Sequence, residues 1–395
     1  MDVQTYRQEL SDELQNILHY WTNNTVDNLH AGFYGSVDNE NIPKAGAPKG
    51  VVLNARILWT FSAASNFLLD KKYLAIAARA YDYLLHFFTD KEYGGVFWSV
   101  DAEGSILNSR KQVYGLAFYL YGLSEYYLAT NEKRILEQAI ALFHLIEEKS
   151  FDKKGKGYFE AFARDWTALT DLRLSAKDAN EKKTMNTHLH IIEAYANLYK
   201  AWPDELLKKR ILQLLEVFDE YMIDRQSHHL ILFFDEAWKA KPDVISYGHD
   251  IEAGWLLQQC AEVINDVYWI GRMKQQAIPV TNAAMEGLDS DGGLWYEYNP
   301  AQDKLTKEKH WWEQAEAMVG FYNAYQVSGE RKFLDHSMAA WQFTKAHILD
   351  KSKGEWYWGI KEDYSRMPGE DKAGFWKCPY HNARACMEII RRINE

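Results

Sequence analysis

Apolar residues recur every three or four positions along most of this chain, and this spacing predicts a mainly helical protein. Within residues 51–67, for example, Leu53, Ile57, Leu58 and Phe61 would share one face of a helix. About twelve helices are expected in total. They are a first segment that closes near Trp21, then residues 51–67, 73–88, 112–128, 134–146, 184–201, 205–222, 250–263, a segment within 267–285, and residues 313–327, 331–348 and 382–393.

A weak internal repeat separates alternate helices and pairs glycine with aromatic residues. Its copies begin at Gly32, Gly94, Gly157, Gly292 and Gly354, while the apolar stretch 230–234 fills the remaining slot without glycine. Each copy is typical of a short β-hairpin. The spacing of roughly sixty to seventy residues fits a helix pair with its loops, at ~1.5 Å rise per helical residue. Six helix pairs with six hairpins at one end predict an all-α protein, an (α/α)6 barrel, with residues 1–395 as a single domain.

Composition narrows the function. The net charge of −11 argues against a nucleic-acid or anionic-membrane partner. Cysteine is sparse, with no disulfide framework and no CxxC motif, and neither a signal peptide nor a membrane-spanning run is evident. We therefore expect a soluble, cytoplasmic protein. The aromatic content of 15 Trp, 25 Tyr and 18 Phe is high for helix packing alone, and a carbohydrate site lined by aromatic rings is one explanation.

The stretch 246–255 carries the first candidate chemistry. Gly248 is expected in a loop and Asp250 in the first turn of a helix. His249, Glu252 and Trp255 then follow at intervals of three, which places an imidazole, a carboxylate and an indole on one helical face. An imidazole serves as acid or base near neutral pH, and a flat indole suits the apolar face of a sugar. The alternative is a helix start with a packed Trp and solvated charges.

Histidines also occur at 188, 190 and 381. On a helix, Asn186 and His190 share a face, whereas His188 points about 200° away, so the two histidines are not expected to bind one metal. A buried structural histidine is the alternative. His381 follows Pro379 at the expected start of the last helix, with Trp376 nearby.

Two further groups contain residues that are unusual for their positions. Trp311 and Trp312 are adjacent at a helix start, so one is expected to pack and the other to line a site. Glu313 and Glu316 follow and could pair with the carboxylate of residue 252, as glycosidases require, or act as ordinary first-turn acids. Arg56 and Tyr114 stand within otherwise apolar helices, where an arginine usually has a paired or functional reason to occur.

Four motifs, in this order, resemble those of the cellobiose 2-epimerases, a family within the N-acylglucosamine 2-epimerase superfamily. They are Asn-Thr-His-Leu-His at 186–190, Tyr-Gly-His-Asp-Ile-Glu at 247–252, Trp-Trp-Glu-Gln-Ala-Glu at 311–316, and the segment 376–381. The resemblance extends over essentially the whole chain. It implies an (α/α)6 barrel that epimerises carbon 2 of the reducing-end glucose of cellobiose or lactose to mannose, with no redox cofactor and no metal.

The resemblance also implies roles for individual residues. It assigns His249 and His381 as the acid/base pair and His190 to ring opening and support of the intermediate. Glu252 would orient His249. The implied substrate-binding residues are Arg56, Tyr114, Asn186, Glu252, Trp255, Trp312, Glu316 and Trp376, with Trp312 and Trp376 as stacking platforms. The expected partner is a disaccharide (cellobiose, lactose or mannobiose), and the expected state is a monomer or weak homodimer.

Other activities stay open at this point. An aldose–ketose isomerase or a monosaccharide 2-epimerase would form the same enediolate intermediate. An (α/α)6 glycoside hydrolase would use two carboxylates instead. A noncatalytic carbohydrate-binding scaffold is a further alternative, which the three placed histidines disfavour.

Overall fold

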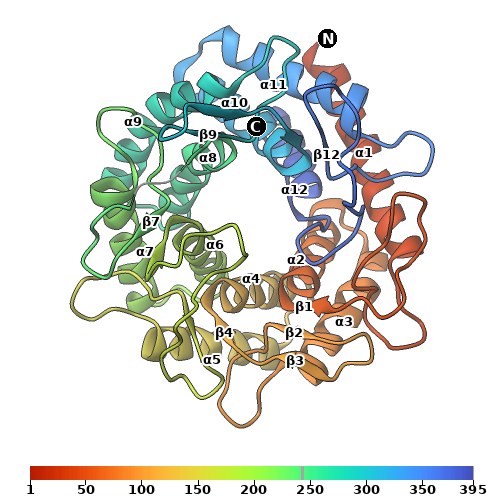
Figure 1. Cartoon of the computed structure of the whole chain (residues 1–395), viewed down its shortest axis with the longest axis vertical. Coiled ribbons are helices and arrows are strands. Elements are labelled where there is room, and N and C mark those ends of the chain that lie inside the picture. The colour runs from red at the N-terminus through yellow and green to blue at the C-terminus, as the bar shows by residue number, and fades with distance from the viewer. Residues whose placement is uncertain (242–243, 395) are drawn as a thin grey trace.

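The computed structural model describes residues 1–241 and 244–394, which form twelve α-helices in two concentric rings (Figure 1). The inner helices are α2 (Val51–Leu68), α4 (Val113–Thr130), α6 (Met185–Ala201), α8 (Tyr247–Val263), α10 (Trp311–Ser328) and α12 (Tyr380–Asn394). The outer helices are α1 (Val3–Asn24), α3 (Leu74–Tyr83), α5 (Lys133–Lys149), α7 (Glu205–Val217), α9 (Val267–Ala284) and α11 (Arg331–Phe343). The prediction of an (α/α)6 barrel is confirmed.

The inner ring is closed by contacts between each helix and the next, including α12 against α2. Helix burial follows from this arrangement. In α4 every residue from Val113 to Ser124 is buried, because the helix is surrounded by its neighbours. Outer helices such as α5 bury only one face, with Ile135, Ala139 and Phe143 at helical spacing. None of the described helices combines the length and the apolarity needed to cross a membrane.

Short elements complete the chain. Two 3₁₀ turns are η1 (Lys71–Tyr73) and η4 (Met285–Gly287), and three outer helices end in π turns, η2 (Leu84–Phe88), η3 (Phe218–Met222) and η5 (Thr344–Ile348). The strands are β1 (Lys49–Gly50), β2 (Ser99–Val100), β3 (Ile106–Asn108), β4 (Lys111–Gln112), β5 (Ala161–Phe162), β6 (Lys183–Thr184), β7 (Phe233–Phe234), β8 (Ile245–Ser246), β9 (Glu297–Asn299), β10 (Lys304–Thr306), β11 (Lys309–His310) and β12 (Gly359–Ile360). All their pairings are antiparallel.

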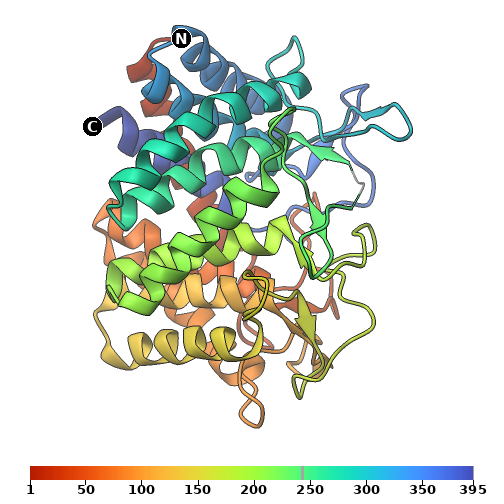
Figure 2. The ribbon, with the colours of Figure 1, turned by 90° about the vertical axis from the view of Figure 1, so that its left-hand side faces the viewer.

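The predicted glycine–aromatic hairpins each follow an outer helix, and loops and strands gather at one end of the barrel (Figure 2). Each hairpin is closed by one antiparallel bridge: Val26 with Phe33, Thr89 with Val96, Phe151 with Tyr158, Ile223 with Leu230, Leu288 with Leu294, and Leu349 with Trp356. Close packing explains the glycine in one of them. A Cβ at Gly157 would lie 2.4 Å from the Trp238 ring.

Ion pairs that each contain a buried lysine fix five of these six hairpins within the described residues. In each, an aspartate of the hairpin meets a lysine that precedes the next inner helix. The pairs are Asp27–Lys49, Asp90–Lys111, Asp152–Lys183, Asp289–Lys309 and Asp350–Lys372, with N–O distances of 2.6–2.8 Å. A buried charge is costly unless it is paired, so each pair holds the start of an inner helix in place.

One expected helix boundary is wrong. Helix α8 begins at Tyr247 rather than at residue 250, so Gly248 is helical and not in a loop. The physical reason is packing against α10. A Cβ at position 248 would lie 2.5 Å from both the Trp312 ring and the Glu313 side chain, so glycine permits close approach of the two helices.

Candidate active site

Most of the predicted site residues come together at the hairpin end of the inner ring, because they lie in the first turns of inner helices. Arg56 is on α2, Tyr114 on α4, Asn186 and His190 on α6, His249 and Glu252 on α8, Trp312 and Glu316 on α10, and His381 on α12. Trp376 lies in the loop before α12. All six inner helices thus contribute, which explains why the motifs are distributed along the whole chain.

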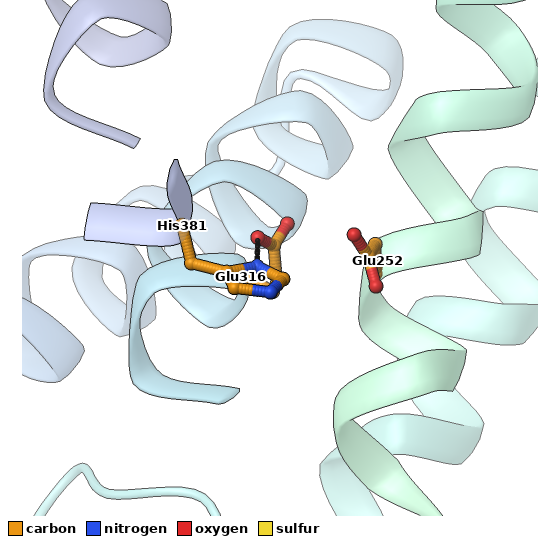
Figure 3. A group of neighbouring side chains, drawn as sticks. All are labelled: Glu252, Glu316 and His381. Carbon is orange, nitrogen blue, oxygen red and sulfur yellow. Dashed lines mark hydrogen bonds and ion pairs between the residues drawn. The ribbon is translucent and has the colours of Figure 1, made fainter. Parts of the chain in front are cut away.

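His381 is held by Glu316. Its Nδ1 lies 2.6 Å from Glu316 Oε1 (Figure 3). The same carboxylate accepts from Arg384 and, at 3.1 Å, from Trp255 Nε1. Burial raises the pKa of Glu316, but these donors favour its carboxylate form. With Glu316 as a carboxylate, the proton of His381 sits on Nδ1 and Nε2 is a free base. Burial, with the positive charges of Arg56 and Arg384, holds the pKa of His381 well below its usual value.

His249 has a different partner from the one expected. Its Nδ1 lies 2.7 Å from Ser246 Oγ, and burial lowers its pKa to about 3. Glu252 does not orient it. Glu252 instead accepts from Arg384 Nη2 at 2.6 Å, because an arginine on α12 reaches across the barrel to it. A serine hydroxyl both donates and accepts, so His249 is free to adopt either tautomer.

Trp312 lies beside both of these histidines. Its ring centroid is 4.9 Å from that of His249 and 5.7 Å from that of His381. Trp311, by contrast, is buried and packs on Trp358. Trp311 therefore packs, as expected for one of the adjacent tryptophans, and the contact of Trp312 with a sugar stays a prediction.

His190 and His188 diverge, as the helical spacing predicted. His190 Nδ1 lies 2.9 Å from Glu193 Oε2, and its ring meets Tyr114 edge to face. His188 is a structural residue, since its Nε2 accepts the backbone N–H of Tyr158 at 2.8 Å. Burial lowers the pKa of His188 to about 3, so it stays neutral.

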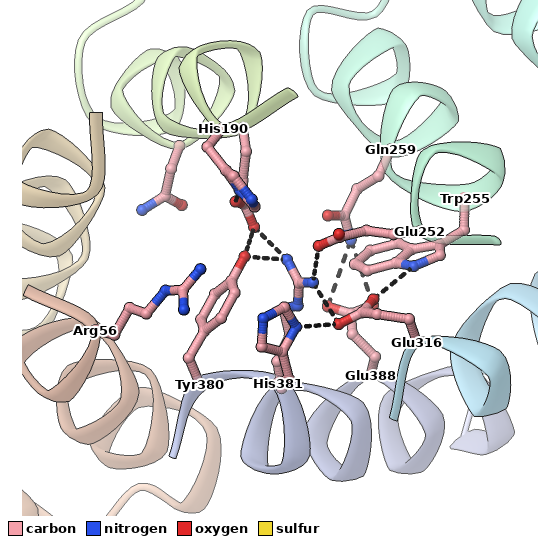
Figure 4. A network of polar contacts seen from close by, with 12 residues as sticks. Arg56, His190, Glu252, Trp255, Gln259, Glu316, Tyr380, His381 and Glu388 are labelled. Carbon is pink, nitrogen blue, oxygen red and sulfur yellow. Dashed lines mark hydrogen bonds and ion pairs between the residues drawn. The ribbon is translucent and has the colours of Figure 1, made fainter. Parts of the chain in front are cut away.

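Arg384 is the main feature that sequence reasoning missed. Its guanidinium contacts Glu193 through Nη1, and through Nη2 it contacts Glu252 at 2.6 Å and Glu316 at 2.7 Å. All four side chains are buried. Figure 4 shows how this network links the regions of His190 and His381. A signal was present in the sequence, because Arg384 lies three residues after His381 on a helix whose buried face is otherwise largely apolar.

The three buried carboxylates that share the Arg384 guanidinium differ in pKa. Burial raises the pKa of Glu193, but Arg384 and His190 outweigh it and lower the pKa to about 2. Burial and the neighbouring charge of Glu316 raise the pKa of Glu252 to about 7. Glu252 is therefore the member of the network that changes its charge near neutral pH.

The same network bears on metal binding. Glu252, Glu316 and His381 offer ligand atoms within 4.8 Å of one another, which would suit a cation in geometry (Figure 3). However, Arg384 already donates to both carboxylates. The guanidinium thus supplies the positive charge that an ion would bring.

Arg56 and Tyr114 form a cationic and hydrogen-bonding pair on the other side of the site. Arg56 Nη2 donates to the Tyr114 hydroxyl at 2.8 Å, and its guanidinium lies 4.1 Å from the Phe118 ring. Burial raises the pKa of Tyr114, which keeps it a neutral phenol. The Trp376 ring is 6.0 Å from that of Tyr114, so this tryptophan borders the same region.

A cavity of about 490 Å³ adjoins His249. Asn186, Ser246 and His249 form part of its wall, and the rest comes mainly from the loop 172–179 and the β9–β10 hairpin. The buried Asn186 Oδ1 has no hydrogen-bond partner within the described residues, which leaves it available to a ligand. Trp255 does not reach this space. It has no exposed surface and packs against Arg384, so its predicted contact with a sugar is wrong.

Comparison with known proteins extends these observations. The family model for N-acylglucosamine 2-epimerase (GlcNAc 2-epimerase) matches residues 32–385. The chain is 46% identical over 385 residues to a cellobiose 2-epimerase of Bacteroides fragilis, covering 97% of this chain and 98% of that protein. It is 39% identical to a cellobiose 2-epimerase of Dictyoglomus turgidum over the full length of both. The structure of a cellobiose 2-epimerase from Bacillus thermoamylovorans superposes with a TM-score of 0.93 at 40% identity, covering 98% of this chain and 100% of that one.

Proposed function

The chain belongs to the N-acylglucosamine 2-epimerase family, and we propose that it is a carbohydrate 2-epimerase that acts on β-1,4-linked disaccharides. Carbon 2 of the reducing-end glucose of cellobiose or lactose is inverted to give mannose. The supporting observation is the placement of His249 and His381 on different helices beside one tryptophan ring. The relatives named cellobiose 2-epimerase support the choice of substrate. The whole chain acts as one catalytic barrel.

The reaction begins with ring opening, because the proton on carbon 2 becomes acidic only in the open-chain aldehyde. His190, fixed through its Nδ1 by Glu193, presents Nε2 for the proton transfers of this step. The neutral base His381 or His249 then removes the carbon 2 proton and leaves a cis-enediolate. The other histidine, protonated beforehand by exchange with solvent, gives its proton to the opposite face of carbon 2, so the configuration inverts. The first histidine then releases the proton it took to solvent, which restores the starting state of the pair.

The enediolate carries negative charge on oxygen, and the site offers matching donors. Arg56 remains cationic and its Nε has no partner within the described residues, while Tyr114 and Asn186 lie on α4 and α6, the next two inner helices. One well-placed donor to such an oxyanion is worth about 3–4 kcal/mol. Arg384 acts differently. It bonds to Glu193 and Glu316, the carboxylates that hold His190 and His381, and not to the sugar.

The size of the binding space supports a disaccharide. The cavity beside His249 and Asn186 has a volume of about 490 Å³, within the usual range of about 300–1,000 Å³ for ligand pockets. The reacting ring lies against Trp312, because that ring flanks both acid/base histidines. The second ring extends into the cavity, where polar and charged side chains such as Lys177, Asp178 and Glu308 offer partners for its hydroxyls.

Product analysis after incubation with cellobiose tests this function. The expected product is the disaccharide with mannose at its reducing end. A ketose product would indicate an aldose–ketose isomerase, free glucose would indicate a hydrolase, and unchanged cellobiose would indicate a binding protein. Higher catalytic efficiency on free glucose than on cellobiose would assign the chain to the monosaccharide epimerases instead.

A further inference from the structure

The six hairpins are equivalent in structure, but two of them lack the glycine that the other four have at one position. The residue just before the closing bridge is glycine in four copies: Gly32, Gly95, Gly157 and Gly293. In the remaining two copies it is His229 and Glu355. Both of these side chains are buried, at 5% and 0% exposure. They belong to the hairpins that precede α8 and α12, the two helices that carry His249 and His381.

Glu355 keeps a backbone conformation that suits glycine. Its φ is +62°, close to the +60° of Gly32 and the +71° of Gly157, in the left-handed region that bulky residues rarely occupy. A buried, charged residue with this backbone needs a compensating gain. The contacts of its carboxylate show what that gain is.

The carboxylate of Glu355 holds the segment around His381. Oε1 accepts from Asn382 Nδ2 and from Lys377 Nζ, each at 2.7 Å. Oε2 accepts from Trp21 Nε1 of α1 at 2.6 Å. Asn382 directly follows His381, and Lys377 directly follows Trp376. The buried side chain of Glu355 thus bonds to both ends of the segment between Lys377 and Asn382, which contains His381 and directly follows Trp376.

His229 makes the corresponding contact in its own copy. Its Nδ1 lies 2.7 Å from Asp250 Oδ2, and Asp250 directly follows His249. The other oxygen of Asp250 accepts the backbone N–H of Leu230 at 2.7 Å, so the carboxylate is held by the hairpin at both oxygens. In α6 and α10, by comparison, the contacts to the hairpin go to its backbone, and the hairpin has glycine. His188 accepts the N–H of Tyr158, while Gln314 accepts the N–H of Leu294 and donates to its carbonyl.

We infer that Glu355 and His229 are positioning residues, each of which fixes one of the two acid/base histidines through the residue that follows it. Glu355 acts on His381 through Asn382, and His229 acts on His249 through Asp250. Neither residue needs to touch the substrate. The inference rests on the proposed two-histidine epimerisation, because it assigns one positioning residue to each face of the intermediate.

The test uses Glu355→Gly and His229→Gly in the full-length protein, which restore the residue of the other copies without backbone strain. In the first variant, Lys377 would be left buried without its counter-charge, so Glu355→Gly is also made together with Lys377→Met. Each variant is expected to lose about 10- to 100-fold in kcat, as for a misplaced catalytic group, with a smaller change in KM. The control is Asp27→Asn, which unpairs the buried Lys49 in a hairpin that precedes no acid/base histidine.

A second readout separates positioning from general loosening of the fold. In deuterated water, solvent exchange at carbon 2 of recovered substrate is compared with epimerisation, starting from cellobiose and separately from its mannose epimer. If one histidine is misplaced, the sugar that the other histidine deprotonates still exchanges its carbon 2 hydrogen with solvent, although its conversion to the epimer slows. Exchange without conversion should therefore be seen with one sugar in Glu355→Gly and with the other sugar in His229→Gly.

The outcomes are distinct. Opposite exchange preferences in folded variants, with no preference for either sugar in Asp27→Asn, support the inference. Equal slowing from both sugars, or unchanged kcat, in variants that keep the wild-type circular dichroism spectrum overturns it while wild-type epimerisation stands. If the wild-type protein does not epimerise cellobiose or its mannose epimer, the proposed function fails and the positioning roles fail with it.

Discussion

His381 is buried and His249 is partly buried, and the two differ in their hydrogen-bond partners, which decides what each can do. Glu316 only accepts, so His381 presents an unprotonated Nε2. Ser246 donates or accepts, so His249 takes whichever tautomer the substrate requires. At the scale of single residues, the group that bonds to Nδ1 of each imidazole therefore determines whether its Nε2 can act as a base or as an acid.

Removing either imidazole should stop inversion. His249→Ala and His381→Ala are each expected to lower kcat for epimerisation by at least about 10²–10⁴-fold, the usual contribution of a positioned acid or base. Steady-state kinetics with cellobiose and a thermal melt check this. A folded His381→Ala protein that epimerises at near wild-type rate would contradict the two-base assignment.

Activity should not depend on an added metal. Glu252, Glu316 and His381 converge, but Arg384 already neutralises the two carboxylates. Full activity is expected after exhaustive chelation and dialysis. If chelation abolished epimerisation and one divalent ion specifically restored it, the guanidinium would not be the only cation that this cluster needs.

Sequence reasoning located the site residues but misjudged several of their partners. His249, Glu252 and Trp255 do lie near one another on α8, as their spacing predicted. Yet Glu252 bonds to Arg384 rather than to His249, and Trp255 is fully buried beside Arg384. The spacing within one helix fixes the direction of a side chain, whereas its partner comes from another helix at a distance that only the closed ring defines.

At the scale of elements, periodicity predicted the helices well because their buried faces repeat at helical spacing. The first turns were harder, and α8 starts before Gly248 because contact with α10 overrides the loop preference of glycine. The repeat predicted the hairpins, including the copy at 230–234 that lacks the glycine–aromatic motif. It could not predict the Asp–Lys pairs, since no motif marks which lysines are buried.

Arg384 connects α12 with the helices α6, α8 and α10 through its ion pairs, and its removal should therefore lower the stability of the protein. Arg384→Met leaves three buried carboxylates without a cation, so we expect it to destabilise the protein by about 3–5 kcal/mol at pH 8. The loss should shrink towards pH 5, where protonation of Glu252, whose pKa is about 7, relieves the repulsion.

Chemical denaturation at the two pH values checks the role of Arg384. Arg392→Met is a suitable control on the same helix, because Arg392 pairs with Glu388 nearer the surface and should contribute less. Equal stability of Arg384→Met and the wild-type protein at pH 8 would show that the buried carboxylates do not depend on Arg384.

At the scale of the whole molecule, the barrel is closed where the chain's first helix meets its last hairpin. Glu13 of α1 accepts from Trp356 Nε1 at 2.7 Å, and Trp21 of α1 donates to Glu355. Burial, with a contribution from Glu355, raises the pKa of Glu13 to about 7. The closure therefore contains a carboxyl group that prefers to be neutral.

This closure predicts a pH-dependent stability. The folded pKa of Glu13 lies above its unfolded value, so the folded state retains the proton and its stabilisation is lost as pH rises from about 4.5 to 7. Glu13→Gln removes this titration. Its stability relative to wild type should rise by up to about 3 kcal/mol across that range, at 1.36 kcal/mol per pKa unit.

Denaturant titrations at pH 4.5, 6 and 8 measure the difference between Glu13→Gln and wild type. Asp12→Asn, on the exposed side of the same helix, should give a nearly constant difference from wild type. A constant difference for Glu13→Gln as well would mean that Glu13 titrates normally in the folded protein.

The central claim is that two histidines exchange the proton of carbon 2 through an enediolate. NMR of the products formed from cellobiose in deuterated water tests it most directly. The account predicts a disaccharide with mannose at the reducing end and deuterium at its carbon 2. A mannose product that retains the original hydrogen at carbon 2 would contradict it, as would the release of free glucose.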